Sequence, residues 1–114
     1  MHVHDLAEAI IFCLEKWDPF DINAPKDVFG KAITILNVGT GNDISIKELA
    51  IKISQLVGYK GKIIWDKTKP DGTKKKLLDV SRLSRLGWKA NTSLDEGILE
   101  TVKQLDFKKL NILK

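Results

Sequence analysis

The chain is poor in cysteine, in aromatic residues and in long apolar runs. Cys13 is the single cysteine among 114 residues, so an internal disulfide is excluded, and a reducing, cytoplasmic location is expected. No apolar run reaches the roughly 18 residues that a membrane-spanning helix needs, so no membrane partner is expected. The first residues also lack the basic flank and the apolar core of a signal peptide.

A large excess of one charge is missing too. The chain has 19 basic and 15 acidic residues, a net charge of +4 and a pI of about 9.2. Acidic residues lie among the basic ones almost everywhere, whereas nucleic-acid-binding proteins concentrate basic residues on one face, often beside aromatic platforms. No nucleic-acid partner is therefore expected. The hydrophobic content of 43% and charged content of 30% fit a single globular region over residues 1–114.

Apolar periodicity and capping motifs predict four helices. They are expected over residues 5–16, 46–57 and 80–86, and from 94 to an end between 105 and 110. Asp5 and Asp79 are the expected N-caps of the first and third helices. Ser45 and Ser93 each precede a glutamate by three residues, which is the pattern of a capping box.

Two apolar segments, 33–38 and 62–65, predict strands, and residues 18–31, interrupted by two prolines, predict a loop. The order of elements indicates an α/β fold. Two strands make a poor sheet by themselves, so the pattern suggests a missing neighbour. Residues 39–41, Gly-Thr-Gly, are expected to form a plain turn, because Ile44 stands where a dinucleotide-binding loop needs its third glycine.

The most informative segment is a basic turn at residues 69–79, Lys-Pro-Asp-Gly-Thr-Lys-Lys-Lys-Leu-Leu-Asp. Proline, aspartate and glycine favour a tight turn, and the lysines that follow lie close together on the surface. Such a cluster suits a polyanion such as a diphosphate. The alternative is a solvated basic loop that serves solubility, since charge runs are usually solvated.

Other candidate sites are weaker. His2 and His4 suggest a metal site, but no third ligand is nearby in the sequence, so structural histidines and no metal are expected. Tyr59 is the single tyrosine, and Ile63 stands four positions later in place of a lysine. No histidine neighbours a serine in a way that suggests a catalytic triad. The chain is therefore expected to hold no catalytic residue of its own.

Several short motifs resemble extended short-chain dehydrogenases/reductases that act on nucleotide sugars. These motifs are His-Val-His-Asp-Leu-Ala at 2–7, Asn-Val-Gly-Thr-Gly at 37–41, Leu-Gly-Trp at 86–88 and Ser-Leu-Asp-Glu-Gly-Ile at 93–98. Within that superfamily, Lys-Pro-Asp-Gly-Thr at 69–73 and Lys-Leu-Leu-Asp-Val-Ser at 76–81 resemble the GDP-L-fucose synthases. The resemblance runs from residue 1 to about 104 and corresponds to the last third of such an enzyme.

The resemblance implies an α/β C-terminal substrate-binding part of an NADP-dependent 3,5-epimerase/4-reductase, with the Rossmann half absent. Such enzymes convert GDP-4-keto-6-deoxy-D-mannose into GDP-L-fucose. The family's glycine-rich cofactor loop and its catalytic Ser, Tyr and Lys are missing from this sequence. The chain is thus expected to bind no NADP alone and to be inactive alone, with a separate Rossmann-half chain or a homodimer as possible partners. The resemblance implies that the GDP-sugar is bound by Asp71, Thr73, Lys75 and Lys76.

The sequence also departs from the family. Lys74 and Lys75 stand where the family has Pro-Arg, so the charge is kept but the bidentate fork of arginine is lost. The chain looks like a fragment, a truncated reading frame or one half of a split gene. Two alternatives stay open: a non-catalytic α/β module that binds nucleotide sugars or another partner, and part of a different nucleotide-sugar epimerase or dehydratase.

Overall fold

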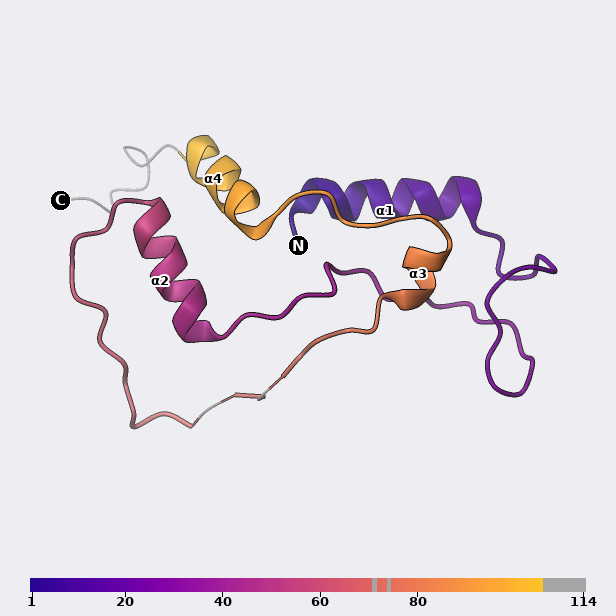
Figure 1. The fold of residues 1–114 in the computed structure, drawn as a ribbon, viewed down its shortest axis with the longest axis horizontal. Helices are drawn as coiled ribbons and strands as arrows, with labels where there is room; N and C mark the ends of the chain where they lie inside the picture. The colour runs from indigo at the N-terminus through magenta and orange to yellow at the C-terminus, as the bar shows by residue number, and fades with distance from the viewer. Residues whose placement is uncertain (71, 74, 106–114) are drawn as a thin grey trace. The chain divides into compact units, whose positions relative to one another are not determined.

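The computed structural model describes residues 1–70, 72–73 and 75–105 (Figure 1). This part of the chain contains four helices: α1 (Val3–Lys16), α2 (Ile46–Leu56), α3 (Ser81–Arg85) and α4 (Leu94–Gln104). All four were expected from the sequence, with ends shifted by a few residues. Within the described residues, no helix has the length and apolar character to cross a bilayer.

The chain packs as two compact units. The first contains Met1–Asp43 and Lys76–Thr92, and so holds α1 and α3. The second contains Ile44–Lys75 and the described residues from Ser93 onward, with α2 and α4. The single region expected over 1–114 stays a prediction.

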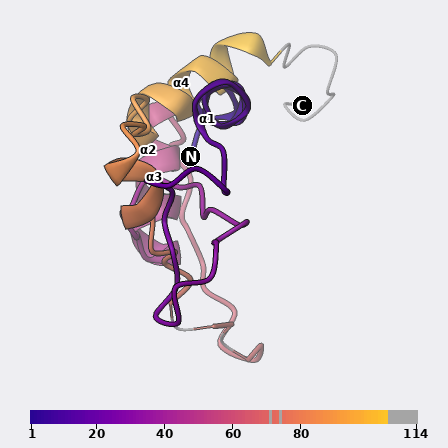
Figure 2. The same ribbon diagram turned by 90° about the vertical axis from the view of Figure 1, so that its right-hand side faces the viewer.

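The first helix begins two residues earlier than expected, because its cap is a histidine. The Nδ1 of His2 accepts a hydrogen bond from the backbone N–H of His4 at 3.4 Å, and the two imidazole rings meet edge to face. The prediction of Asp5 as N-cap is wrong. Asp5 lies inside the first turn of α1, 2% exposed, and its carboxylate accepts hydrogen bonds from a distant segment. Figure 2 views α1 along its axis.

The core of the first unit joins α1, α3 and the segment after α3. Ala9, Leu83 and Trp88 are buried together. Partly buried apolar side chains pack around them, namely Phe12, Cys13, Leu36, Val38 and Ala90. Burial raises the pKa of the Cys13 thiol, which keeps it protonated and agrees with the inert thiol that its apolar setting indicates. Gly87 ends α3 with φ +107°, which favours glycine.

The predicted strands at 33–38 and 62–65 are wrong for the described residues, which contain no β-ladder. In that part of the chain an isolated antiparallel bridge joins Lys26 to Ala32. A strand needs a neighbour whose backbone pairs with it, and neither segment has one there. Leu36 and Val38 nevertheless pack against the core, so the apolar pattern of 33–38 correctly indicated burial.

Residues 18–31 contain turns and bends and the bridge residue Lys26, and no helix. Three aspartates shape this segment, because each carboxylate accepts hydrogen bonds from amides two to four residues later. These aspartates are Asp18, Asp21 and Asp27.

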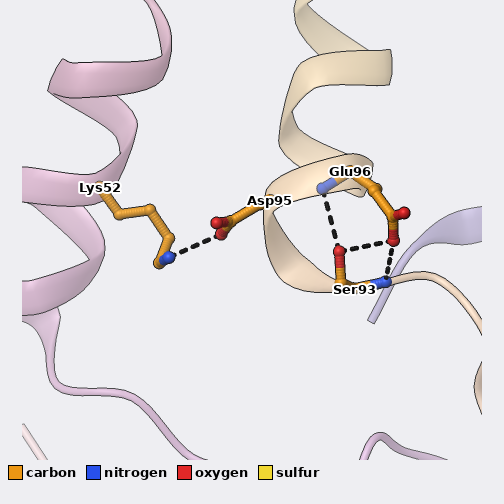
Figure 3. A network of polar contacts seen from close by, with 4 residues as sticks. All are labelled: Lys52, Ser93, Asp95 and Glu96. Carbon is orange, nitrogen blue, oxygen red and sulfur yellow. Dashed lines mark hydrogen bonds and ion pairs between the residues drawn. The ribbon is translucent and has the colours of Figure 1, made fainter.

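Both capping boxes of the second unit are confirmed. The Ser93 hydroxyl accepts a hydrogen bond from the Glu96 amide at 3.2 Å, and the Glu96 carboxylate accepts one from the Ser93 amide at 2.9 Å (Figure 3). Ser45 and Glu48 form the same pair of bonds at the start of α2. The two helices contact each other, and the Lys52 ammonium lies 2.6 Å from the Asp95 carboxylate (Figure 3).

Candidate functional site

The basic loop begins at a turn that is built by Asp66. Its carboxylate accepts hydrogen bonds from the Thr68 hydroxyl at 2.6 Å and from the Thr68 amide at 2.9 Å. Both bonds lower the pKa of Asp66, and the bond from the Thr68 hydroxyl has the larger effect. The carboxylate therefore stays charged at neutral pH and keeps accepting these bonds. The bonds are local, which means that the sequence from 66 to 68 is sufficient to shape this end of the loop.

The other end of the loop lies at Asp79, just before α3. The prediction of Asp79 as the N-cap of this helix is wrong, because Val80 occupies the N-cap position. The Asp79 carboxylate accepts a hydrogen bond from the Ser81 amide at 2.9 Å and so supports the first turn of α3. This bond, then the one with the Ser81 hydroxyl, lowers the pKa of Asp79, and the charges of Arg82 and Arg85 add to the effect. The Asp79 carbonyl also accepts a hydrogen bond from the Asn37 side-chain amide at 3.1 Å.

Three of the four sequence-predicted substrate residues are described, and none of these three lies in a helix or strand. Thr73, Lys75 and Lys76 are all exposed. Within four positions they supply a hydroxyl and two ammonium groups that are accessible to a ligand. Such groups suit a diphosphate, because ammonium groups neutralise phosphate charge and a hydroxyl donates to a phosphate oxygen. Asp71, the fourth predicted residue, lies outside the described residues.

An open pocket of about 310 Å³ in the first unit adjoins the Asp79 end of the loop. Sequence reasoning missed it, because its walls come from two segments more than forty residues apart. Arg82 could have been noticed as a cation that follows a loop expected to bind an anion. The pocket is lined by Ile33, Thr34, Ile35, Asn37, Asp79 and Arg82.

A second open hollow of the first unit, about 430 Å³, lies along α1. It combines Ile11, Phe12 and Trp88 with the acidic side chains of Glu8 and Glu15. Its lining also contains Lys89, so two carboxylates stand against one ammonium group, and this balance suits a nucleotide diphosphate poorly.

The turn at residues 39–41 does not fit the pyrophosphate of NADP. The turn at 39–41 resembles a phosphate-binding glycine loop only in part, and Val80 covers it. A Cβ atom built on Gly39 or on Gly41 would lie 3.3 Å from a methyl group of Val80. Because glycine has no side chain, Val80 can pack against the backbone at both positions. A pyrophosphate would need that backbone to be accessible. The expected plain turn agrees with this packing.

The buried carboxylate of Asp5 joins α1 to residues 91 and 92 in the first unit. Asp5 accepts hydrogen bonds from the Thr92 hydroxyl at 2.9 Å, from the Thr92 amide at 3.2 Å and from the Asn91 amide at 3.4 Å. Burial acts to raise the pKa of Asp5, but these hydrogen bonds and the nearby His2 outweigh it, so the pKa is lowered. Asp5 is thus a structural anion, engaged by its own chain and not open to a ligand.

Comparison with known proteins identifies relatives over most of the chain. No protein-family profile matches it. It is 40% identical over 103 residues to a probable GDP-L-fucose synthase 1 of Oryza sativa, a match that covers 90% of this chain and 27% of the relative. It is 43% identical over 101 residues to the GDP-L-fucose synthase of Escherichia coli, covering 89% of this chain and 30% of the relative.

A solved structure of a GDP-sugar reductase is also similar to nearly the whole chain. The chain superposes on a GDP-6-OMe-4-keto-L-xylo-heptose reductase of Campylobacter jejuni with a TM-score of 0.76 and 32% identity. That match covers 97% of this chain and 30% of the reductase. The resemblance inferred from the motifs is therefore confirmed: the chain is homologous to the C-terminal portion of the GDP-L-fucose synthases, and it spans less than a third of their length.

Proposed function

Starting from this homology, we propose that the chain provides the loop that binds the diphosphate of a GDP-linked sugar in a GDP-L-fucose synthase-like enzyme. The reaction is the NADP-dependent conversion of GDP-4-keto-6-deoxy-D-mannose to GDP-L-fucose, by epimerisation at C3 and C5 and reduction at C4. The nicotinamide site and the catalytic Ser, Tyr and Lys lie outside this sequence. The chain alone is inactive in this proposal.

The observation that carries the proposal is the exposure of Thr73, Lys75 and Lys76. Before them in the sequence Asp66 bonds to Thr68, and after them Asp79 bonds to Ser81, so each carboxylate orders the backbone beside it. An ammonium group about 4 Å from a phosphate charge gains roughly 1 kcal/mol in bulk water and more where water is displaced. Lys75 and Lys76 together therefore supply a substantial part of diphosphate affinity.

Asp71 belongs to the proposed site through the family resemblance, as the residue that contacts the substrate. In the sequence Asp71 stands four positions before Lys75. A carboxylate suits a hydroxyl group of the ligand and not its phosphates. We assign Asp71 and the lysines to different parts of the GDP-sugar for this reason.

GDP titration tests the proposal. The Lys75→Ala/Lys76→Ala double variant is compared with Lys31→Ala/Lys47→Ala, which removes the same charge from exposed positions outside the loop. The scaffold is the 114-residue chain itself and, in parallel, the E. coli relative with its matched residues replaced by this chain. We expect the loop variant to weaken GDP binding at least tenfold and the control to change it less than twofold. Equal affinities for the two variants would remove the lysines from the site.

The alternative of an autonomous binding module is less well supported. A module that works alone covers its apolar surface, whereas Leu14 is 81% exposed and Ile35 is 76% exposed. A stable, monodisperse monomer that binds GDP without a second polypeptide would favour the module.

A further inference from the structure

Residues 25–33 form a hairpin in the first unit, and its tip is apolar. At the tip, Val28 is 93% exposed and Phe29 is 92% exposed. Large apolar side chains that stand open beside each other indicate contact with another molecule. Lys26 precedes this pair, Lys31 follows it, and both lysines are exposed. The hairpin therefore presents an apolar tip with an ammonium group on each side of it in the sequence.

Local hydrogen bonds give the hairpin its shape. The Asp27 carboxylate accepts bonds from the amide of Phe29 at 2.9 Å and from the amide of Lys31 at 2.8 Å. The Asp27 amide donates to the Lys31 carbonyl at 2.9 Å, and Lys26 and Ala32 form an antiparallel bridge. Because the turn is already formed, little conformational entropy is lost when the tip binds a partner.

The hollow along α1 has the complementary composition. Its apolar lining consists of Ile11, Phe12 and Trp88. Glu8 and Glu15 also line it, and they stand seven positions apart on α1, which is about 10 Å along the helix axis. With Lys89 as a single opposing cation in the lining, the hollow is acidic on balance. Its volume of about 430 Å³ lies in the range of roughly 300–1,000 Å³ that is usual for binding pockets.

We propose that the hairpin tip of one copy of this chain enters the hollow along α1 of a second copy. In this contact, Val28 and Phe29 of one copy pack against the apolar lining of the other. The lysines beside the tip pair with Glu8 and Glu15. Lysine stems are long and flexible, so two ammonium groups from one turn can reach carboxylates that are about 10 Å apart.

A second copy is the occupant that the charges and the exposures support. Each copy carries both halves of the contact, a basic apolar tip and an acidic apolar hollow. The tip is open to solvent in the single chain, so it does not fill the hollow of its own copy. Two copies related by a two-fold axis exchange tips, which makes the contact twice and closes the assembly as a dimer.

Sedimentation equilibrium of the 114-residue chain tests this contact through its charges. Glu8→Lys/Glu15→Lys reverses the charge of the hollow, and Lys26→Glu/Lys31→Glu reverses the charge of the hairpin. Either variant alone places like charges across the contact, so its self-association should be at least tenfold weaker than that of the parent. An equimolar mixture of the two variants restores opposite charges at both contacts. We expect the mixture to associate with an affinity within threefold of the parent's.

The apolar part of the contact is tested by Phe29→Asp. This variant should also self-associate at least tenfold more weakly than the parent chain. Ile64→Asp is the matched control, because Ile64 is 80% exposed but lies in the second unit, and it should change the affinity less than twofold. Circular dichroism of each variant shows that helix content is kept, as expected for exposed positions.

Three results would overturn the proposal. The first is a parent chain that stays monomeric. The second is a mixture of the charge-reversed variants that associates no better than its components, which would mean that the chain associates through another surface. The third is an equal loss of affinity in Phe29→Asp and Ile64→Asp. The inference does not depend on the proposed function, so Lys75→Ala/Lys76→Ala should self-associate as the parent does whatever its affinity for GDP.

Discussion

The two units of the chain are held together in different ways. The first buries Ala9, Leu83 and Trp88 together, and it also buries the Asp5 carboxylate, whose partners lie 86 and 87 positions away. In the second, α2 has no buried residue and α4 buries only Gly97, and the start of each helix is fixed by a capping box within four residues. The first unit therefore depends on burial and long-range contacts, and the second on local hydrogen bonds.

The largest predicted effect is that of removing the central side chain of the first unit. Leu83 is 1% exposed, and Leu83→Ala should destabilise this unit by about 3 kcal/mol, since it leaves a cavity in a small core. Hydrogen exchange of α1 amides measures the loss. Amides of α2 and α4 should change little, and equal losses in both units would contradict the contrast drawn above.

Replacing the buried carboxylate should have the next largest effect. In Asp5→Asn the side-chain amide presents one acceptor oxygen where the carboxylate offers two, to three donors from Asn91 and Thr92. We expect a loss of about 2 kcal/mol, because the buried side chain at position 5 would then satisfy fewer of these part-buried donors. Chemical denaturation followed by tryptophan fluorescence measures it, since Trp88 lies in the same core. A loss below about 0.5 kcal/mol would show that Asp5 merely fills space.

The stability of the first unit should fall more steeply with decreasing pH in the parent chain than in Asp5→Asn. The folded-state pKa of Asp5 is lowered, so the unfolded chain binds the proton more tightly. Its contribution to stability is complete above the unfolded pKa of about 3.9 and is lost as pH falls through the lower folded value. Denaturation of the first unit between about pH 5 and pH 2 should thus be steeper in the parent than in Asp5→Asn. Parallel curves would contradict this assignment.

The smallest effects are predicted for the second unit. Ser93→Ala removes the cap of α4 and should cost about 1 kcal/mol, because the Glu96 amide loses its acceptor. Lys52→Ala, which breaks the partly exposed pair with Asp95, should cost no more than about 0.5 kcal/mol. Amide exchange in α4 measures both changes. A larger effect from Lys52→Ala than from Ser93→Ala would mean that this unit depends on its ion pair and not on its caps.

The difference between local and long-range contacts explains which predictions from the sequence were right and which were wrong. Ser45 and Ser93 were identified as caps because each bonds to a residue three positions away, and such spacing is visible in sequence. Asp5 was misassigned as a cap, because Asn91 and Thr92 cannot be recognised as its partners from local patterns. The strands at 33–38 and 62–65 were wrong for a related reason: strand pairing depends on a distant neighbour, and apolar alternation shows burial without showing a partner.

The candidate site was predicted unevenly. Thr73, Lys75 and Lys76 were predicted from turn chemistry and family resemblance, and the structure leaves all three exposed. Their contact with a ligand stays a prediction. The pocket beside Asp79 was not found, because Arg82 and residues 33–37 come together only in the folded first unit.

The hydrogen bonds between Asp5 and Thr92 also set an order of events during synthesis. A ribosome makes α1 before Thr92, so the Asp5 carboxylate has no Thr92 to bond until more than eighty further residues have been added. At the usual rate of about 5–20 residues per second, that interval lasts on the order of several seconds. Leu83 and Trp88, which bury Ala9 in the folded unit, are also absent for most of it. The first unit can therefore complete its core only when the segment that follows the basic loop has been synthesised.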